Sequence, residues 1–344
     1  MLHGGGIYGL KTEYDFSVNL NPYPTPLKVR EAIAGAVADV SRYPDIEQTA
    51  FREAVALSEK NGLKASNIIG GNGASELLVA VLRYLAPKRA LLPVPSFYGY
   101  IHSLNMLEGC ETEEYQLSEE RDFEMDGGFI DRITERTDTV IFASPNNPTG
   151  RCTDEGILDR IMRRCADTGA SVIIDESFLK LSEGSSAKKY IGKIPGLFII
   201  SSYTKLFSIP GVRVGYVIAD ERDTEGLGRF LPEWNLSVFA DAAGKACAGV
   251  LMEDHFIRAS LEMIKGGREQ LTGALRSSGI KVYPSDTNFI LVRTERELYG
   301  ELQKHGILIR DCRNFKGLGE GYYRIAVKKH EDDLISFLRF ERDL

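Results

Sequence analysis

Short apolar runs, each followed by a polar motif, recur through much of this chain. They cover residues 90–94, 139–143, 171–174, 197–201 and 214–219, and helical stretches separate several of them. Apolar strands that are connected through helices form mostly parallel sheets with helices on both faces. The pattern therefore predicts an α/β fold, and in such folds ligands bind beyond the carboxyl ends of the strands.

Chemically distinctive residues stand at the predicted strand ends. They are Gly73, Ser75, Phe97, Asn147, Asp175 and Lys205. Each has an ordinary alternative: Asp175 could cap a helix, Phe97 could be a core residue, and Asn147 could complete a proline turn. These alternatives do not explain why all six residues stand at strand ends. We therefore expect the six side chains to converge on one crevice.

A glycine turn at residues 70–76 precedes an apolar helix predicted at 77–85. The unpaired amides and the dipole at a helix N-terminus attract anions. The turn is not a dinucleotide fingerprint, because Glu76 occupies the place of the third glycine. It is a candidate phosphate site, although a glycine turn alone is often only a turn.

Lys205 lies between two apolar runs, with Ser202 and Thr204 just before it and Arg213 eight residues after it. A lysine between buried strands is costly unless it is paired or used chemically. One hypothesis is that Lys205 holds an aldehyde cofactor as a Schiff base. The two hydroxyls and Arg213 would then bind the phosphate of that cofactor. A solvated loop lysine beside an unrelated arginine is the alternative.

The other strand-end residues match the remaining demands of pyridoxal 5′-phosphate. Asp175 could keep the ring nitrogen protonated, Phe97 could stack on the ring, and Asn147 could donate to the ring hydroxyl. The candidates for the phosphate are Gly73, Ala74, Ser75, Ser202, Thr204 and Arg213.

Composition limits the class of protein. The chain has 344 residues, a 43% hydrophobic share, a 26% charged share and a net charge of −7. No basic tract favours nucleic acid, no apolar run is long enough to cross a membrane, and no signal peptide is apparent. Five scattered cysteines without a C-x-x-C motif suggest neither disulfides nor a metal site. A cytoplasmic enzyme acting on a small molecule is expected.

These motifs occur in the order seen in a known family. The segments are 73–75, 144–150, 175–178 and 202–205, followed by Arg213 and Arg324. In this the chain resembles the class I/II pyridoxal-phosphate aminotransferases of fold type I. The resemblance implies a large domain with a mostly parallel seven-stranded sheet and a small α+β C-terminal domain.

Within that family the sequence resembles the histidinol-phosphate aminotransferase group, and more closely the related L-threonine-O-3-phosphate decarboxylases. The features are the opening at His3 to Asn21, the loops at 203–211 and 309–315, and Phe178, where aminotransferases usually place a cofactor-binding tyrosine. The resemblance implies decarboxylation of L-threonine-O-3-phosphate to (R)-1-amino-2-propanol O-phosphate, a step of cobalamin synthesis. The alternative is an aminotransferase that uses 2-oxoglutarate as amino acceptor.

The same resemblance suggests further site residues. Tyr43 would reach the cofactor phosphate of a neighbouring subunit, which implies a homodimer, and Trp234 would wall the substrate pocket. Arg324 matches the family's carboxylate-binding arginine. Other candidates for substrate anions are Arg310, Arg313, His3 and Asn19.

Three regions are expected along the chain. Residues 1–35 should form an extended N-terminal arm lining the active site, and residues 36–235 the large cofactor-binding domain. Residues 236–344 should hold a connecting helix, with a break near Gly266 and Gly267, and the small domain.

Overall fold

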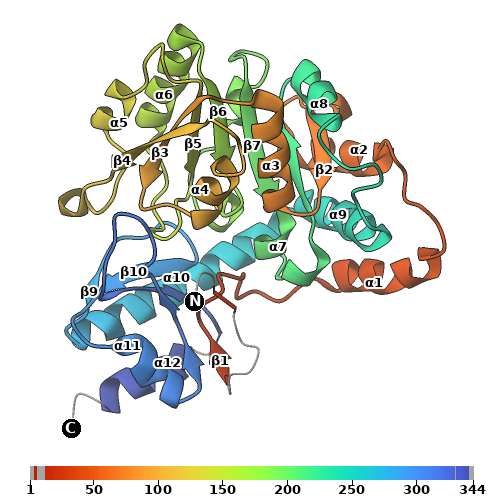
Figure 1. Ribbon diagram of the computed structural model, residues 1–344. Coiled ribbons are helices and arrows are strands. Elements are labelled where there is room, and N and C mark those ends of the chain that lie inside the picture. The colour runs from red at the N-terminus through yellow and green to blue at the C-terminus, as the bar shows by residue number, and fades with distance from the viewer. Residues whose placement is uncertain (1–3, 6–11, 330, 341–344) are drawn as a thin grey trace.

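A seven-stranded sheet forms the centre of the protein in the computed structural model, which describes residues 4–5, 12–329 and 331–340 (Figure 1). Its strands, in spatial order, are β2 (Ile68–Gly71), β8 (Gly215–Ile218), β7 (Leu197–Ser202), β6 (Ser171–Asp175), β5 (Thr139–Ala143), β3 (Arg89–Val94) and β4 (Glu111–Gln116). Only β8 runs antiparallel to its neighbours. The prediction of an α/β fold with a mostly parallel seven-stranded sheet is confirmed.

Helices cover both faces of this sheet because its central strands are apolar on both sides. Along β6, Val172 and Ile174 pack into one core, whereas Ile173 packs into the other. Helices α3 (Ala74–Leu85), α4 (Tyr98–Leu104) and α8 (Glu221–Gly228) contribute to the second core. Helices α2 (Thr49–Glu59), α5 (Gly127–Asp131), α6 (Glu155–Thr168) and α9 (Val238–Leu251) contribute to the first.

The edge strand β4 has no apolar run in the sequence. It reads Glu-Thr-Glu-Glu-Tyr-Gln and is largely exposed, yet it pairs in parallel with the whole of β3. Charged side chains are a common feature of edge strands, where they discourage pairing with other chains.

A second, antiparallel sheet forms the smaller part of the molecule. Its order is β12 (Arg310–Asp311), β13 (Tyr322–Ala326), β10 (Phe289–Arg293) and β9 (Lys281–Val282). Helices α11 (Leu298–Lys304) and α12 (Glu331–Phe340) belong to the same region. Strand β1 (Tyr14–Asp15) brings the N-terminal segment to it by pairing with β11 (Ile307–Leu308).

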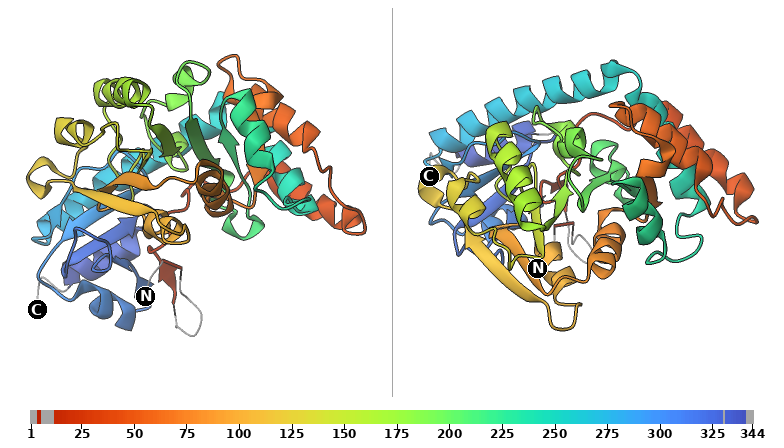
Figure 2. Two further views of the ribbon diagram at one scale, coloured as in Figure 1. Left: turned by 45° about the horizontal axis from the view of Figure 1, so that its top comes forward. Right: turned by 90° about the horizontal axis from the view of Figure 1, so that it is seen from above.

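Helix α10 (Asp254–Ser277) connects the two parts and runs along one side of the molecule (Figure 2). Phe256 and Ile264 pack into the core of the large sheet, whereas Leu271 and Leu275 pack into that of the small one. The predicted break at residues 266–267 is wrong: glycine costs a helix only about 1 kcal/mol, and packing on both sides maintains α10. We propose that the boundary between the domains lies within this helix.

The N-terminal arm is shorter than predicted. Helix α1 (Leu27–Gly35) begins directly after Pro26, so residues 27–35 are not extended. The arm is fixed to the lysine segment, because the amide N–H of Asn21 donates to the carbonyl of Lys205 (3.0 Å) and its Nδ2 to that of Leu206 (2.8 Å).

The remaining helical elements are short. They are α7 (Tyr203–Leu206) and the 3₁₀ turns at Ala36–Asp39, Ala65–Asn67, Glu119–Arg121, Leu179–Leu181, Ala187–Tyr190 and Pro210–Val212. No helix in the described part of the chain is long and apolar enough to span a membrane.

Candidate active site

A cavity of about 240 Å³ lies where the carboxyl ends of the large sheet meet the N-terminal arm and the small sheet. Many predicted site residues line it together: Asn19, Ala74, Ser75, Phe97, Asn147, Asp175, Phe178, Ser202, Thr204, Lys205, Arg213, Arg310 and Arg324. Gly73 stands beside it, in contact range of Arg213. His3 lies outside the described residues.

Lys205 sits on the single-turn helix α7, directly after β7. The hydroxyl of Ser202 starts this turn by accepting a hydrogen bond from the amide of Thr204 (3.2 Å). Burial, and then repulsion from Arg324 and Arg213, lower the pKa of the Lys205 amine to about 8. A substantial fraction of the amine is therefore neutral near physiological pH, which is the form needed for attack on a carbonyl.

Asp175 ends β6 and faces the cavity with both carboxylate oxygens engaged. Oδ2 accepts a hydrogen bond from the hydroxyl of Tyr100 (2.9 Å), and Oδ1 accepts one from the amide of Ser177 (2.9 Å). Burial, followed by the negative charge of Asp175, raises the pKa of Tyr100 well above its ordinary value, so Tyr100 remains a donor. Tyr100 does not stand out in the sequence, because a tyrosine in an apolar helix looks like a core residue.

The glycine turn and Arg213 together form an anion cradle. Gly73 has φ = +79° and precedes the first residue of α3, and a Cβ at this position would lie 2.8 Å from Nη2 of Arg213. Arg213 itself has φ = +58°, a region that non-glycine residues seldom adopt and that is enriched at functional sites. The hydroxyls of Ser202 and Thr204 lie 2.8 Å apart in the same cavity.

Arg324 is a buried cation that forms no ion pair with a described carboxylate. Its Nη1 donates to Oδ1 of Asn147 (2.5 Å) and its Nη2 to the carbonyl of Ser17 (2.6 Å). The side chain is only 6% exposed, Nε has no hydrogen-bond partner, and burial lowers its pKa to about 10. Among the described residues no carboxylate forms an ion pair with it. An anionic ligand would therefore offset the free-energy cost of burying this unpaired charge.

Other buried polar groups at the cavity also lack a hydrogen-bond partner. Oδ1 of Asn19 and the hydroxyl of Ser177 are buried and accept or donate no hydrogen bond. Ser177 was not singled out from the sequence, and only its position after Asp175 could have suggested it. Unsatisfied buried polar atoms of this kind are expected where a polar ligand binds.

Phe97 and Phe178 are two of the aromatic residues that line the cavity. Phe97 packs edge-to-face against Tyr100 (5.6 Å between centroids), and Phe178 packs edge-to-face against Phe289 (5.1 Å). Both rings line the cavity. They provide the apolar surfaces that a flat heteroaromatic ring requires.

The outer arginines differ in position. Arg310 lines the cavity, donates to Oδ1 of Asn314 (2.7 Å) and lies over the ring of Phe315. Arg313 does not line it and instead pairs with Asp311 (2.6 Å). Of these two candidates, only Arg310 is placed to meet a ligand in this cavity.

Tyr43 and Trp234 lie away from the cavity within one chain. Their rings pack together at 4.8 Å between centroids, and they are 80% and 43% exposed, respectively. The structure does not bring either residue to the other predicted site residues of the same chain.

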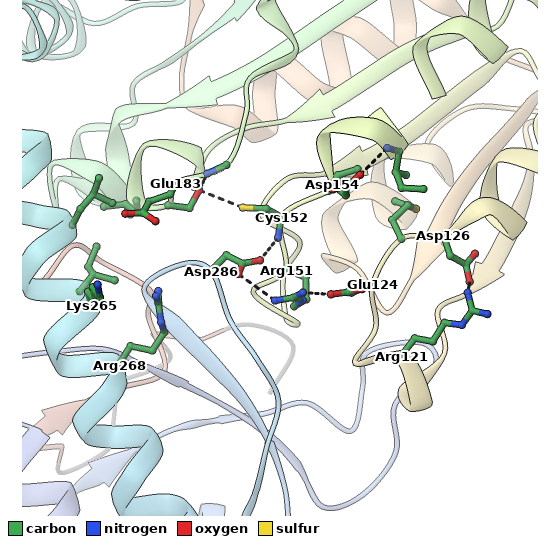
Figure 3. Close-up of a pocket in the computed structure, with 18 of the residues that line it drawn as sticks. Arg121, Glu124, Asp126, Arg151, Cys152, Asp154, Glu183, Lys265, Arg268 and Asp286 are labelled. Carbon is green, nitrogen blue, oxygen red and sulfur yellow. Dashed lines mark hydrogen bonds and ion pairs between the residues drawn. The ribbon is translucent and has the colours of Figure 1, made fainter. Parts of the chain in front are cut away.

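A larger cavity of about 730 Å³ opens between α10 and the loop after β5 (Figure 3). Within it, Asp286 accepts hydrogen bonds from Nη1 of Arg151 (3.1 Å) and from the amide of Cys152 (2.8 Å). Figure 3 shows these contacts joining the segment before β10 to the loop that carries Asn147. None of the predicted site residues that the structure describes lines this cavity.

The residues of the smaller cavity fit pyridoxal phosphate. They supply an amine of lowered pKa, a fixed carboxylate, flat apolar walls and an anion cradle that a side chain at residue 73 would obstruct. In the described part of the chain no cluster of histidine, cysteine, aspartate or glutamate could hold a metal ion.

Comparison with known proteins agrees with this chemistry. The family model "Aminotransferase class I and II" matches residues 11–338. The chain is 34% identical to a putative threonine-phosphate decarboxylase of Caldanaerobacter subterraneus subsp. tengcongensis (96% of this chain, 91% of the relative). It is 30% identical to the threonine-phosphate decarboxylase of Salmonella typhimurium (98% and 95%).

A solved structure of an aminotransferase has a similar fold. The histidinol-phosphate aminotransferase from Clostridium acetobutylicum superposes with a TM-score of 0.87 at 28% identity, covering 96% of this chain and 100% of that one. From the family model and these relatives, the chain belongs to the class I and II aminotransferase family, whose fold is type I and whose cofactor is pyridoxal 5′-phosphate.

Proposed function

We propose that this enzyme decarboxylates L-threonine-O-3-phosphate to (R)-1-amino-2-propanol O-phosphate. The observation that carries the proposal is the buried guanidinium of Arg324, which forms no ion pair with a described carboxylate and lines the same cavity as Lys205. A substrate anion beside Lys205 is the partner that this charge requires.

The charge of the cavity supports a substrate with two anions. Among the described residues, four cations line it, namely Lys205, Arg213, Arg310 and Arg324, against the one carboxylate of Asp175. Arg213 and the glycine turn are assigned to the cofactor phosphate, which leaves Arg310 and Arg324 for the substrate. L-Threonine-O-3-phosphate presents one carboxylate and one phosphate, and the guanidinium fork binds both kinds of group.

The proposed roles follow from the contacts. When bound, pyridoxal phosphate withdraws electrons from the bonds at the α-carbon of an amino acid. Lys205 would hold the cofactor and, once displaced by the substrate amine, return a proton to the α-carbon. Asp175 would keep a proton on the ring nitrogen, and Asn147 would donate to the ring oxygen. Arg324 and Arg310 would orient the substrate so that the bond to the carboxylate is the one that breaks.

Two further features favour decarboxylation. Phe178 gives the ring an apolar neighbour where an aminotransferase tyrosine would add a hydroxyl, and the relatives named threonine-phosphate decarboxylases match the chain nearly end to end. The arm contributes Asn19, whose Oδ1 lacks a partner and could bind a donor on the substrate.

An aminotransferase is the second candidate, and the similarity to the histidinol-phosphate aminotransferase of Clostridium acetobutylicum favours it. In this reaction Lys205 would remove a proton from the α-carbon, and 2-oxoglutarate would accept the amino group. Its two carboxylates would also match Arg310 and Arg324.

We further propose a homodimer in which Tyr43 reaches the cofactor phosphate of the other subunit. The stretch of chain from the start of α1 to residue 46 carries further exposed apolar side chains: Leu27, Val37, Val40 and Ile46. Figure 1 shows α1 at the periphery of the molecule. Light scattering should give twice the chain mass, and Tyr43→Phe should weaken cofactor binding; a monomer that binds the cofactor normally would contradict this assembly.

Product analysis tests the reaction. The purified enzyme loaded with pyridoxal phosphate is incubated with L-threonine-O-3-phosphate, with and without 2-oxoglutarate. Aminopropanol phosphate formed without an oxo acid supports decarboxylation. A 2-oxo product that forms only with 2-oxoglutarate would contradict decarboxylation and support transamination.

A further inference from the structure

Tyr100 contacts two of the groups that would hold the cofactor ring, Asp175 and Phe97. Its hydroxyl donates to Oδ2 of Asp175 (2.9 Å), and its ring meets that of Phe97 at 81° with centroids 5.6 Å apart. The side chain is 3% exposed and borders the cavity. One residue of α4 therefore touches a strand-end carboxylate from β6 and the aromatic residue that directly precedes its own helix.

The backbone of this turn is shaped for the same contact. A Cβ at Gly99 would lie 2.3 Å from the nearest ring atom of Phe97, so only glycine leaves room for this ring position. Phe97 precedes the first helical residue, and Tyr100 lies one turn further on. Residues 97–100 thus place an aromatic face and a hydrogen-bond donor at the same cavity.

We propose that Tyr100 is a positioning residue that fixes the carboxylate of Asp175, and the adjacent ring of Phe97, for binding pyridoxal phosphate. The inference rests on the proposed cofactor site but not on which reaction occurs there. It extends the site to a residue that would not itself touch the reacting atoms.

Two donors at different oxygens explain how the carboxylate is fixed. The amide of Ser177 holds Oδ1 and the hydroxyl of Tyr100 holds Oδ2, so rotation of the carboxylate would break one of the two hydrogen bonds. Each oxygen retains a further lone pair for a ligand. Without Tyr100, Oδ2 would lose a charge-assisted hydrogen bond and the group would be free to turn away.

The experiment measures the dissociation constant of pyridoxal phosphate by absorbance titration of the apoenzyme. Tyr100→Phe keeps the ring but removes the donor, and we expect binding to weaken by about 10- to 100-fold, the range for a hydrogen bond to a charged group. In an Asp175→Ala background the same change should have less than about a twofold effect, because no carboxylate remains to position.

Tyr84→Phe is the matched control. Tyr84 also donates to an aspartate, Asp223 (3.0 Å), and packs edge-to-face on a phenylalanine, Phe198, but it does not line the cavity. Its removal should leave cofactor affinity unchanged. Thermal unfolding of the apoenzymes separates positioning from general stability, since Tyr100→Phe should lower the melting temperature no more than Tyr84→Phe does.

Two results would overturn the inference. One is wild-type affinity in Tyr100→Phe, and the other is an equal loss in the presence and absence of Asp175. A wild-type chain that binds no pyridoxal phosphate would remove the cofactor site and this inference together. A chain that binds it normally but releases no carbon dioxide would remove only the decarboxylase proposal.

Discussion

The guanidinium of Arg324 and the amide oxygen of Asn147 are 2.5 Å apart, although one residue lies in the small sheet and the other follows β5 of the large sheet. This hydrogen bond uses Nη1 of the guanidinium, and Nε has no hydrogen-bond partner. An incoming substrate anion would therefore meet a guanidinium that is already oriented, with little side-chain entropy left to lose.

Replacing Arg324 with methionine should weaken substrate binding while leaving the cofactor attached. We expect KM for L-threonine-O-3-phosphate to rise by about 10- to 100-fold, the usual loss for a charge-assisted contact. Steady-state kinetics together with the visible spectrum of the bound cofactor would measure both effects. Arg313→Met is the control, since Arg313 pairs with Asp311 outside the cavity. Equal effects of the two substitutions would contradict the assignment.

Attachment of the cofactor should depend on pH through Lys205. Burial and the neighbouring arginines lower the pKa of its amine to about 8 from 10.5. The amine is thus protonated below that pH and neutral above it, so the rate of attachment to the apoenzyme should rise with pH and level off above about pH 8. Arg324→Met removes a repelling charge and should move the midpoint to higher pH. A midpoint near that of an exposed lysine would show that Lys205 is solvated.

Asp286 should stabilise the loop that carries Asn147. It accepts hydrogen bonds from Arg151 and from the amide of Cys152 (Figure 3), so Asp286→Ala should lower the free energy of unfolding by about 1–3 kcal/mol. Cofactor affinity should fall with it. Denaturant unfolding and cofactor titration would measure the two quantities. Glu183→Ala is the control, because Glu183 lines the same cavity without holding this loop; if it has the same effect, the loop contact is not the cause.

Glu119 should make the contact between the two sheets sensitive to acid. It accepts hydrogen bonds from Lys281 (2.8 Å), Arg293 (2.9 Å) and Tyr322 (2.8 Å). Although burial raises the pKa of Glu119, the donors, Lys281 foremost, outweigh it and hold the pKa below the ordinary 4.5.

The folded chain therefore gains stability from ionised Glu119 above about pH 4.5, and this gain is lost as the pH falls further. Glu119→Gln should cost about 1–3 kcal/mol at neutral pH and flatten the decline in acid. Urea unfolding at several pH values would measure it. The exposed neighbour Glu120 provides the control substitution Glu120→Gln, and an unchanged acid profile in Glu119→Gln would refute the assignment.

The large sheet was predictable where burial is complete. Strands such as β5 and β6 are apolar on both faces, and this leaves a continuous signal in the sequence. Strand β4 has no such apolar signal in its sequence, because its side chains are largely exposed at the edge of the sheet. The continuity of α10 through residues 266–267 depends on packing against two cores, which no local propensity reveals.

The same distinction applies to the site. Lys205, Asp175 and Asn147 stand at strand ends, where topology alone brings them together, and the structure places them in one cavity. The contact of Tyr100 with Asp175 depends on how α4 packs against β6, which is a matter of tertiary packing, whereas Ser177 contacts Asp175 locally, two residues along the chain. The binding roles of all these residues stay predictions, as do that of Tyr43 across a dimer and that of Trp234 at the substrate pocket.

Carbon dioxide release from carboxyl-labelled L-threonine-O-3-phosphate tests the central claim most directly. With no oxo acid present, the wild-type enzyme should release one carbon dioxide for each aminopropanol phosphate formed. Lys205→Ala should be slower by at least about 10²–10⁴-fold, the usual contribution of a proton-transferring group. Retention of the label by the wild-type enzyme, with turnover appearing only when 2-oxoglutarate is added, would contradict the account.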